Sequence, residues 1–257
     1  MREVALGHGL SLDGYRLGRC LREGKRATVH YATDAEGREW ALKRFRAGDP
    51  AAEKEWGLEV PDVPGLLLPA ARGRDGDGSP WLVFPYCPGG DLGARLARRL
   101  PVPALIFLMK DVLMTLEGLH ARGLVHRDLS PFNLLFDAGS SVRLGDLGCL
   151  LKAGERPDIP RDGLGTVAYA APEQLLGGPA EPSSDLYALG AICYECLSGA
   201  PPFPAEAPER RAARKARGGP PPLPGALGAL AGSLMDPDPR RRPSPRAALE
   251  RLDGCQG

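Results

Sequence analysis

The sequence predicts an α+β protein of two lobes, a small strand-rich lobe followed by a larger helical one. Short β-like runs dominate residues 15–84, whereas helical periodicity dominates from residue 105 onward. A stretch rich in Pro and Gly, residues 85–90, separates the two regions. Polar motifs typical of a chemical site begin just beyond this junction, and clefts between lobes are where ligands bind.

The first lobe is expected to be a sheet with one short helix. Its apolar runs are four to eight residues long and are bounded by Gly, Asp and Pro, as strands are. The run at residues 66–69 is the weakest of them. The predicted strands are Tyr15–Leu21, Thr28–Thr33, Glu39–Phe45, Leu66–Pro69 and Trp81–Phe84, and the helix is Ala51–Gly57.

The second lobe is expected to be mainly helical. Leucine and valine recur at three- and four-residue steps from Leu105 to Leu119, which gives one apolar face. A second helix is predicted for Ser183–Ser198, with Ser183 or Ser184 as its N-cap. Further helices are expected at Pro208–Arg217, Ala226–Met235 and Ser244–Leu252. We expect one domain over residues 1–257, with an N-lobe at about 10–85, a hinge at 85–90 and a C-lobe at 91–257.

Composition argues against several classes of protein. Over 257 residues the net charge is +1, so no overall field favours nucleic acid or an anionic membrane. We find neither a signal peptide nor a membrane segment, and we expect a cytoplasmic protein; nothing specifies its oligomeric state. Cys193 and Cys196 have C-x-x-C spacing, but their apolar helical surroundings favour packing over a metal or redox site.

Residues 126–133 carry the strongest chemical motif, His-Arg-Asp-Leu-Ser-Pro-Phe-Asn. Asp128 and Asn133 lie five residues apart on a predicted loop, and a second acid follows in the tripeptide Asp146-Leu147-Gly148. Transfer of a phosphoryl group from ATP requires a base near the acceptor hydroxyl and oxygen ligands for Mg²⁺. The spacing of these three residues therefore points to phosphoryl transfer.

These motifs resemble the catalytic loop and the D-F-G element of eukaryotic-type (Hanks-type) serine/threonine protein kinases, as found in bacteria. The resemblance implies a protein-kinase-like fold that uses ATP and Mg²⁺. It makes Asp128 the catalytic base and Asn133 and Asp146 the metal ligands. Ala41-Leu42-Lys43 is similar to the V-A-I-K element of the family, which makes Lys43 the phosphate-binding lysine.

The resemblance also implies residues around the nucleotide. Glu55 is the expected partner of Lys43, with Glu53 and Glu59 as alternatives. Only Gly24 remains of the glycine-rich loop, since Arg22 and Ala27 occupy the other two glycine positions. Asp91 is a candidate for the ribose hydroxyls, or equally a helix cap. The expected nucleotide-binding set is Gly24, Val29, Ala41, Lys43, Glu55, Phe84, Tyr86, Cys87, Asp91 and Leu135.

Residues 165–173 resemble the G-T-x-x-Y-x-A-P-E segment that receives the acceptor in serine/threonine kinases. The match implies a protein substrate with a Ser or Thr acceptor, and it places Thr166 against Asp128. In the same family Glu173 pairs with a buried arginine, here Arg242. Asp185 would anchor the backbone of the catalytic loop.

Two alternatives stay open, and the departures from the family pattern at Ser130 and in the glycine-rich loop favour the first of them. Ser130 stands where serine/threonine kinases carry a lysine, and losing one charged donor at a transition state costs about 3–4 kcal/mol. The first alternative is a weak or inactive pseudokinase that acts as a nucleotide-binding scaffold. The second is a small-molecule phosphotransferase of the aminoglycoside type, against which the A-P-E segment counts.

A cluster of basic residues near the C-terminal third has two interpretations. The simpler one is a solvated helix face with Glu206 as an ion-pair partner, and the other is a docking patch for an acidic protein partner. The residues are Arg210, Arg211, Arg214, Lys215 and Arg217.

Arg127 belongs to a class of kinases that a loop phosphate usually switches, yet residues 146–165 contain no Ser, Thr or Tyr. We expect an acid to pair with Arg127 constitutively, with Glu155, Asp158 and Asp162 as candidates. The variant Arg127→Ala should then show lower kinase activity in a labelled-ATP assay. Unchanged activity would contradict the pairing.

Overall fold

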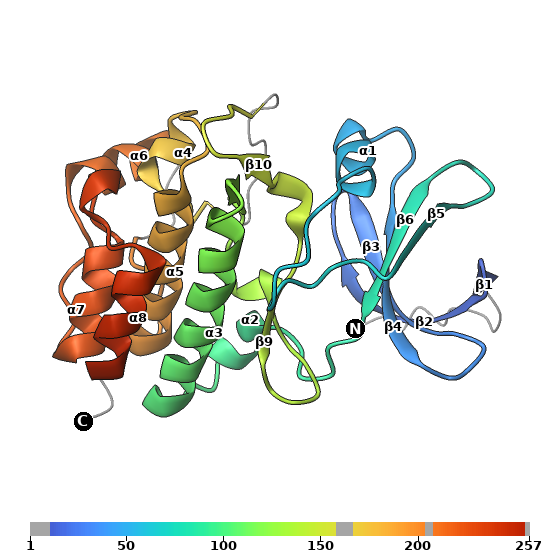
Figure 1. The fold of residues 1–257 in the computed structure, drawn as a ribbon, viewed down its shortest axis with the longest axis horizontal. Helices are drawn as coiled ribbons and strands as arrows, with labels where there is room; N and C mark the ends of the chain where they lie inside the picture. Colours follow the sequence, from blue (N-terminus) through green and yellow to red (C-terminus); the bar gives the residue numbers. More distant parts are fainter. Residues whose placement is uncertain (1–10, 158–166, 204–207, 255–257) are drawn as a thin grey trace. The chain divides into compact units, whose positions relative to one another are not determined.

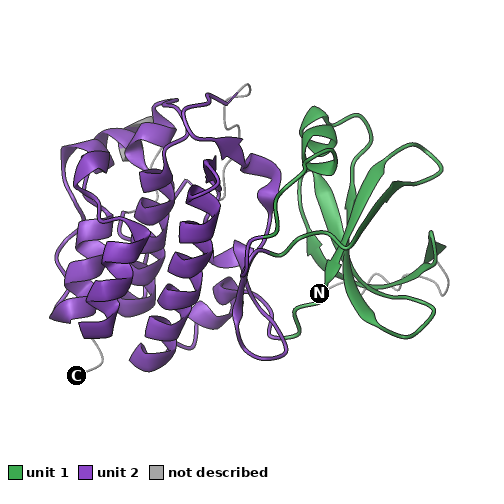
Figure 2. Cartoon of the chain, in the orientation of Figure 1, with its two compact units in different colours: residues 1–62, 67–88 green, residues 63–66, 89–257 purple. Residues whose placement is uncertain are grey.

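The computed structural model describes residues 11–157, 167–203 and 208–254. The chain divides into two compact units (Figure 2). The first unit comprises residues 1–62 and 67–88, and the second comprises residues 63–66 and 89–257. The predicted α+β class is confirmed, because the first unit is mainly sheet and the second mainly helix (Figure 1). Within the described ranges, no helix is long and apolar enough to cross a membrane.

The first unit is built on a six-stranded antiparallel sheet with the order β1-β2-β3-β4-β6-β5. Hairpins connect β1 to β4 in sequence, and α1 (Pro50–Trp56) comes next. Asp49 caps α1 by accepting a hydrogen bond from the backbone N–H of Ala51. The strands are β1 (Ser11–Leu12), β2 (Tyr15–Glu23), β3 (Ala27–Thr33), β4 (Glu39–Phe45), β5 (Ala71–Arg74) and β6 (Pro80–Pro85).

The period of two along these strands gives the sheet two apolar faces. On one face, Ala32, Leu42, Trp81 and Val83 form a buried cluster. On the other face, a second buried cluster packs against α1, with Trp56 and Phe84 at its edge; its members are Ala27, Phe45, Ala52 and Leu82. Four of the predicted strands and the predicted helix are thus confirmed.

The predicted strand Leu66–Pro69 is wrong. Leu66 belongs to the second unit, where it forms only an isolated parallel bridge with Leu144. Pro69 has no N–H to donate to a ladder. The edge strand is instead β5 (Ala71–Arg74), which pairs with β6. Its alternation of Ala and Gly with Arg gives no apolar run that would have predicted it.

The second unit is built around two long helices with many buried side chains, α3 (Val102–His120) and α5 (Pro182–Ser198). The predicted face from Leu105 to Leu119 is buried, which confirms the helical interpretation. Short strands lie between these two helices in the sequence and flank residues 126–133 and 146–148. The other helices are α2 (Leu92–Leu96), α4 (Pro172–Leu175), α6 (Pro208–Arg217), α7 (Gly225–Leu234) and α8 (Pro245–Asp253), and the strands are β7 (Leu124–Val125), β8 (Leu134–Phe136), β9 (Val142–Leu144) and β10 (Leu151–Lys152).

The start of α5 differs from the prediction. Pro182 occupies the first turn and Glu181 is the N-cap residue, so neither Ser183 nor Ser184 caps the helix. The hydroxyl of Ser184 instead donates a hydrogen bond to Glu173 at 2.7 Å. Farther along α5, Cys193 and Cys196 are buried, and burial raises the pKa of the Cys196 thiol to about 12.

Two glycines test how tightly the helices of the second unit pack. A Cβ on Gly190 in α5 would lie 2.7 Å from the Cβ of Leu234 and 3.0 Å from the carbonyl oxygen of Ala231. A Cβ on Gly232 in α7 would have no such neighbour within 4 Å. Gly190→Ala should therefore lower the free energy of unfolding by about 1–3 kcal/mol. Gly232→Ala should raise it by up to about 1 kcal/mol, since alanine favours helix more.

Chemical denaturation of both variants beside the parent protein measures this difference. Two changes of the same sign and size would contradict the packing between α5 and α7.

Candidate active site

In the first unit, Lys43 on β4 is paired with Glu55 on α1. The ammonium Nζ donates to both carboxylate oxygens of Glu55, at 2.6 and 2.8 Å. Both side chains are largely shielded from solvent, with exposed fractions of 15% and 9%. Because a shielded ion pair with two short hydrogen bonds holds its geometry, the position of the Lys43 ammonium depends on α1.

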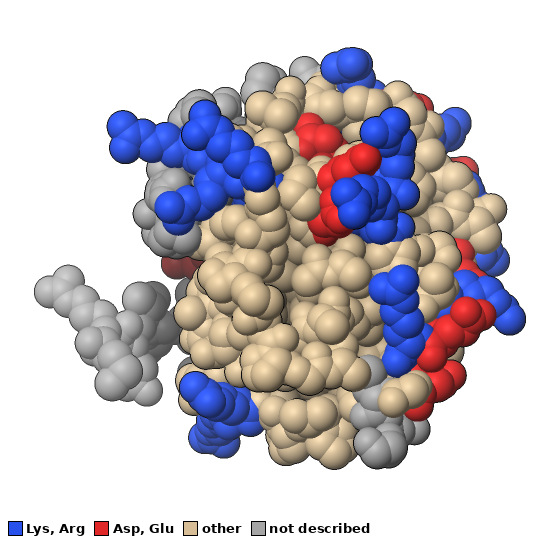
Figure 3. All heavy atoms as spheres, turned by 90° about the vertical axis from the view of Figure 1, so that its left-hand side faces the viewer, with Lys and Arg blue, Asp and Glu red and all other residues tan. Residues whose placement is uncertain are grey.

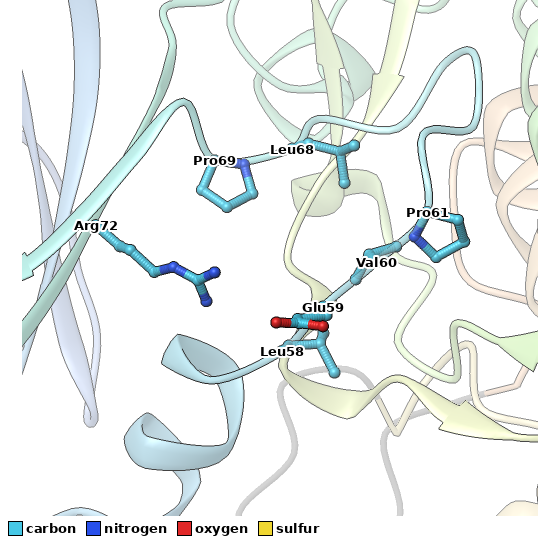
Figure 4. A pocket seen from close by; sticks show the side chains of 7 residues that line it. All are labelled: Leu58, Glu59, Val60, Pro61, Leu68, Pro69 and Arg72. Carbon is cyan, nitrogen blue, oxygen red and sulfur yellow. The ribbon is translucent and has the colours of Figure 1, made fainter.

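The other two glutamates considered for Lys43 lie elsewhere. Glu53, also on α1, accepts hydrogen bonds from Arg74 on β5 at 2.6 and 2.9 Å. Glu59 lies beyond the end of α1, where its carboxylate lines an open hollow of about 430 Å³ together with Arg72 (Figure 4). Of the three glutamates, Glu55 is therefore the one that pairs with Lys43.

Four of the expected nucleotide-binding residues lie on one face of the sheet. In the antiparallel register, Val29 is opposite Lys43, and Ala41 is opposite Phe84. Ala41 and Lys43 are two residues apart on β4, so their side chains point to the same side. The same face carries α1, which brings Glu55 to this side of the sheet.

Gly24 lies in the tight turn between β2 and β3, where its N–H donates to the carbonyl oxygen of Ala27 at 2.9 Å. Beyond the end of β6, Tyr86 packs edge-on against Tyr31 with ring centroids 5.1 Å apart. The next residue, Cys87, is buried. A ring of the first unit thus packs against Tyr86.

In the second unit, the catalytic loop is held by Asp185 of α5. This carboxylate accepts hydrogen bonds from the backbone N–H groups of His126 and Arg127, at 2.9 and 2.8 Å. It also bonds His120 Nε2 at 2.8 Å. Burial alone would raise the pKa of Asp185, but the hydrogen bond and charge of His120 outweigh it, and the pKa is lowered. The expected anchoring of the loop by Asp185 is therefore present.

Asn133 lies beside both acids of the motif. Its side-chain Nδ2 donates to the backbone oxygen of Asp128 at 2.8 Å and to the carboxylate Oδ2 at 3.1 Å. Its own backbone oxygen accepts the N–H of Gly145, the residue before Asp146, at 2.9 Å. This bond continues the antiparallel pairing of β8 with β9. A short β-hairpin thus brings Asn133 next to the segment that leads into Asp146.

Two further residues, His126 and Gln174, form hydrogen bonds to the backbone of this region. His126 accepts the N–H of Asp128 at Nδ1, so its Nε2 carries the proton and donates to the oxygen of Gly145 at 3.1 Å. Gln174 donates from Nε2 to the oxygen of Arg127 at 3.3 Å. The sequence gives no signal for Gln174, whereas His126 is the first residue of the motif at 126–133.

Asp91 and Leu135 face each other across an isolated antiparallel bridge in the second unit. One carboxylate oxygen of Asp91 accepts the N–H of Ala94 at 2.8 Å and caps α2. Of the two interpretations of Asp91, the helix cap is therefore present. The ribose interpretation stays a prediction that involves the rest of the carboxylate.

Residues 167–173, which we call the acceptor segment, end at an ion pair. Arg242 donates to both carboxylate oxygens of Glu173 at 2.6 and 2.9 Å, and its side chain has no exposed surface. Burial would raise the pKa of Glu173, but hydrogen bonding to Arg242 and the charge of Arg242 lower it. The expected pairing is present, while Thr166 lies outside the described residues.

Both backbone polar groups of Arg127 are hydrogen-bonded, its N–H to Asp185 and its carbonyl oxygen to Gln174. Among the candidate acids, Glu155 is exposed and accepts the N–H of Lys152 at 3.0 Å. Asp158 and Asp162 lie outside the described residues. The pairing of Arg127 with an acid stays a prediction.

The donor set at this loop fits Mg²⁺. In phosphoryl-transfer sites Mg²⁺ is bound by one or two protein oxygens together with phosphates and water, and Asp146 and Asn133 offer a carboxylate and an amide oxygen. Because the NH₂ group of Asn133 donates to Asp128, its Oδ1 is the atom left for a cation. In the described part of the chain, no cluster of three or more His, Cys, Asp or Glu residues suits a metal.

Comparison with known families agrees with these contacts. The family model described as the protein kinase domain matches residues 74–252. The chain belongs to the protein kinase family. The match includes the catalytic loop, the acceptor segment and Arg242, and it begins after Lys43.

Several bacterial relatives are similar to this chain. The serine/threonine-protein kinase PknL of Mycobacterium tuberculosis is 41% identical over 136 residues, 51% of this chain and 34% of PknL. The DNA damage-responsive serine/threonine-protein kinase RqkA of Deinococcus radiodurans is 36% identical over 215 residues, 78% of this chain and 32% of RqkA. The serine/threonine-protein kinase PknA of M. tuberculosis is 33% identical over 234 residues, 84% of this chain and 54% of PknA. The chain thus spans a third to a half of these relatives.

The ion pair of Glu173 and Arg242 predicts a pH-dependent stability. Glu173→Gln leaves Arg242 buried without a carboxylate and should lower the free energy of unfolding by about 3–5 kcal/mol at pH 7. A carboxyl whose pKa is lowered on folding stabilises the protein above its ordinary value of 4.5, and this contribution is lost as the pH falls through the folded value. Urea denaturation at pH 7 and at several lower pH values should show the two proteins converging.

Glu250→Gln is the matched control, since Glu250 is 71% exposed and lies 3.9 Å from Arg246. The Glu250→Gln variant should leave the free energy of unfolding unchanged at every pH tested. A gap between Glu173→Gln and the parent that stays constant down to the acid limit would argue against a lowered pKa of Glu173.

Proposed function

We propose that this protein transfers the γ-phosphate of MgATP to serine or threonine hydroxyls of protein substrates. The observation that carries the proposal is the catalytic loop, in which Asp185 fixes the backbone and Asn133 joins Asp128 to the segment of Asp146. The family membership of the chain and the serine/threonine kinases among its relatives add support.

In this proposal the second unit supplies the chemistry. Asp128 accepts or orients the proton of the attacking hydroxyl. Asn133 and Asp146 hold Mg²⁺, which neutralises charge on the phosphates. The hydrogen bonds from Asn133 to Asp128 tie the base to the metal ligands, so the hydroxyl and the phosphates are presented in a fixed relation.

The first unit binds the nucleotide in this proposal. Lys43 contacts the phosphates, and Glu55 holds its ammonium in place. Val29, Ala41 and Phe84 lie against the adenine, with Gly24 at the phosphates. The backbone of Tyr86 and Cys87 meets the edge of the base. The same proposal assigns the ribose hydroxyls to Asp91 and an apolar contact with the base to Leu135. A cytoplasmic location belongs to the same proposal, because ATP is supplied there.

Two substitutions test the proposed roles. Asp128→Asn removes the base, and the transfer of labelled phosphate from ATP to a generic protein substrate should fall about 10²–10⁴-fold while nucleotide binding persists. Lys43→Met removes a preorganised cation and should lower the transfer rate about a hundredfold. The measurement is incorporation of label in the presence of Mg²⁺, beside nucleotide binding by calorimetry.

The controls carry the same chemical changes at the surface. Asp253→Asn alters an acid that is 71% exposed at the end of α8, and Lys54→Met alters an exposed lysine on α1. Both should retain the parent activity. A parent protein that binds nucleotide but transfers no label, or an Asp128→Asn variant as active as the parent, would overturn the proposal.

A further inference from the structure

Lys215 of α6 is buried, with no exposed surface. The interpretation of this residue as part of a solvated basic face is therefore wrong for Lys215. Arg210, Arg214 and Arg217 are exposed on the same helix, which fits a solvated face and a docking patch equally. The side of the molecule that bears α6, α7 and α8 carries several Lys and Arg side chains in its upper part (Figure 3). The Arg211 side chain and Glu206 lie outside the described residues.

The contacts of Lys215 explain how a buried ammonium is accommodated. Its Nζ donates to three backbone oxygens of the acceptor segment, those of Val167 at 3.1 Å, Ala168 at 3.0 Å and Ala170 at 2.6 Å. Three acceptors match the three N–H donors of an ammonium group. The rings of Tyr187 and Phe203 lie 5.3 and 5.6 Å from Nζ, within the range of cation–π attraction.

The free-energy cost of burying the Lys215 ammonium group shows that its hydrogen bonds matter. An ammonium taken out of water loses several kcal/mol unless hydrogen bonds replace its hydration. A lysine in a helix that also has a solvated face would ordinarily extend into water. Since Lys215 points inward instead, the structure depends on its contact with the three carbonyl groups.

The same segment is tied to the catalytic loop. The hydroxyl of Tyr169 donates to Glu195 of α5 at 2.6 Å. Gln174, one residue beyond the segment, accepts the N–H of Ala171 and donates to the oxygen of Arg127, the neighbour of Asp128. The acceptor segment is thus held by α5, by α6 and by the loop that carries Asp128.

We propose that Lys215 is a positioning residue for the protein acceptor. Its ammonium draws the carbonyl groups of residues 167, 168 and 170 to one point and fixes the segment in the shape that receives the acceptor peptide beside Asp128. This inference rests on the proposed function, and it makes Lys215 important for the protein substrate and unimportant for ATP.

The test measures the kinetics for the protein substrate and for ATP separately. Lys215→Met keeps a similar side-chain length and removes all three donors. We expect kcat/KM for a generic protein substrate to fall about tenfold or more, chiefly through KM. The KM for ATP and the slow hydrolysis of ATP without acceptor should stay within about twofold of the parent. Arg217→Met, an exposed position on the same helix, is the matched control and should leave every value unchanged.

Chemical rescue adds a result that loss of stability alone would not produce. Lys215→Ala removes the atoms beyond Cβ, which n-propylammonium replaces, so this cation should restore use of the protein acceptor. The neutral 1-propanol should not. If Lys215→Met does not fold at the assay temperature, Lys215→Gln keeps two N–H donors without the charge and should give an intermediate KM for the protein substrate.

Three outcomes would count against the proposal. Acceptor kinetics unchanged in a folded Lys215→Met variant would overturn the role of Lys215 and leave the proposed function intact. A parallel fall of ATP hydrolysis and acceptor phosphorylation, with no rescue by n-propylammonium, would assign Lys215 to general stability. A parent protein that phosphorylates no protein would overturn the proposed function and this inference with it.

Discussion

The buried carboxylate of Asp185 is the constraint on which the catalytic loop depends. With 1% of its surface exposed, it accepts two successive backbone N–H groups, those of His126 and Arg127. Arg127 has a φ of +68°, a left-handed conformation that is unfavourable for a residue with a side chain. Because one carboxylate binds both N–H groups, this conformation is maintained, and it sets the direction in which the chain continues to Asp128. The hydrogen bonds between Asn133 and Asp128 follow from that direction.

Buried charge recurs in the second unit, and each instance joins segments distant in sequence. Asp185 of α5 holds the catalytic loop, Arg242 holds Glu173, and Lys215 of α6 holds the acceptor segment. Replacing one partner of such a contact leaves the other buried and uncompensated, so these contacts specify one arrangement of the segments more than they add to stability. The first unit contains a similar contact between Lys43 and Glu55.

Much of the fold could be predicted from apolar periodicity alone. The strands from residue 15 to 45 and the helix α3 present a repeated apolar face, whereas β5 alternates Ala and Gly with Arg and shows none. Motif order was enough to pair Glu173 with Arg242 and Asp185 with the catalytic loop. It could not assign Ser184, which had the features of a helix cap but bonds Glu173. Nor could it assign Lys215, because its partners are backbone oxygens 45–48 residues away that leave no pattern in the sequence.

The order of these contacts along the chain has a consequence for biosynthesis. The N–H of His126 is bound by a residue made 59 positions later, and Glu173 is bound by an arginine made 69 positions after it. At a translation rate of about 5–20 residues per second, each of these intervals lasts on the order of several seconds. A growing polypeptide that already contains Asp128 therefore lacks, for that time, the carboxylate that holds the backbone on its N-terminal side. Chain growth itself thus delays the anchoring of this loop until Asp185 has been added, and the pairing of Glu173 until Arg242 has been added.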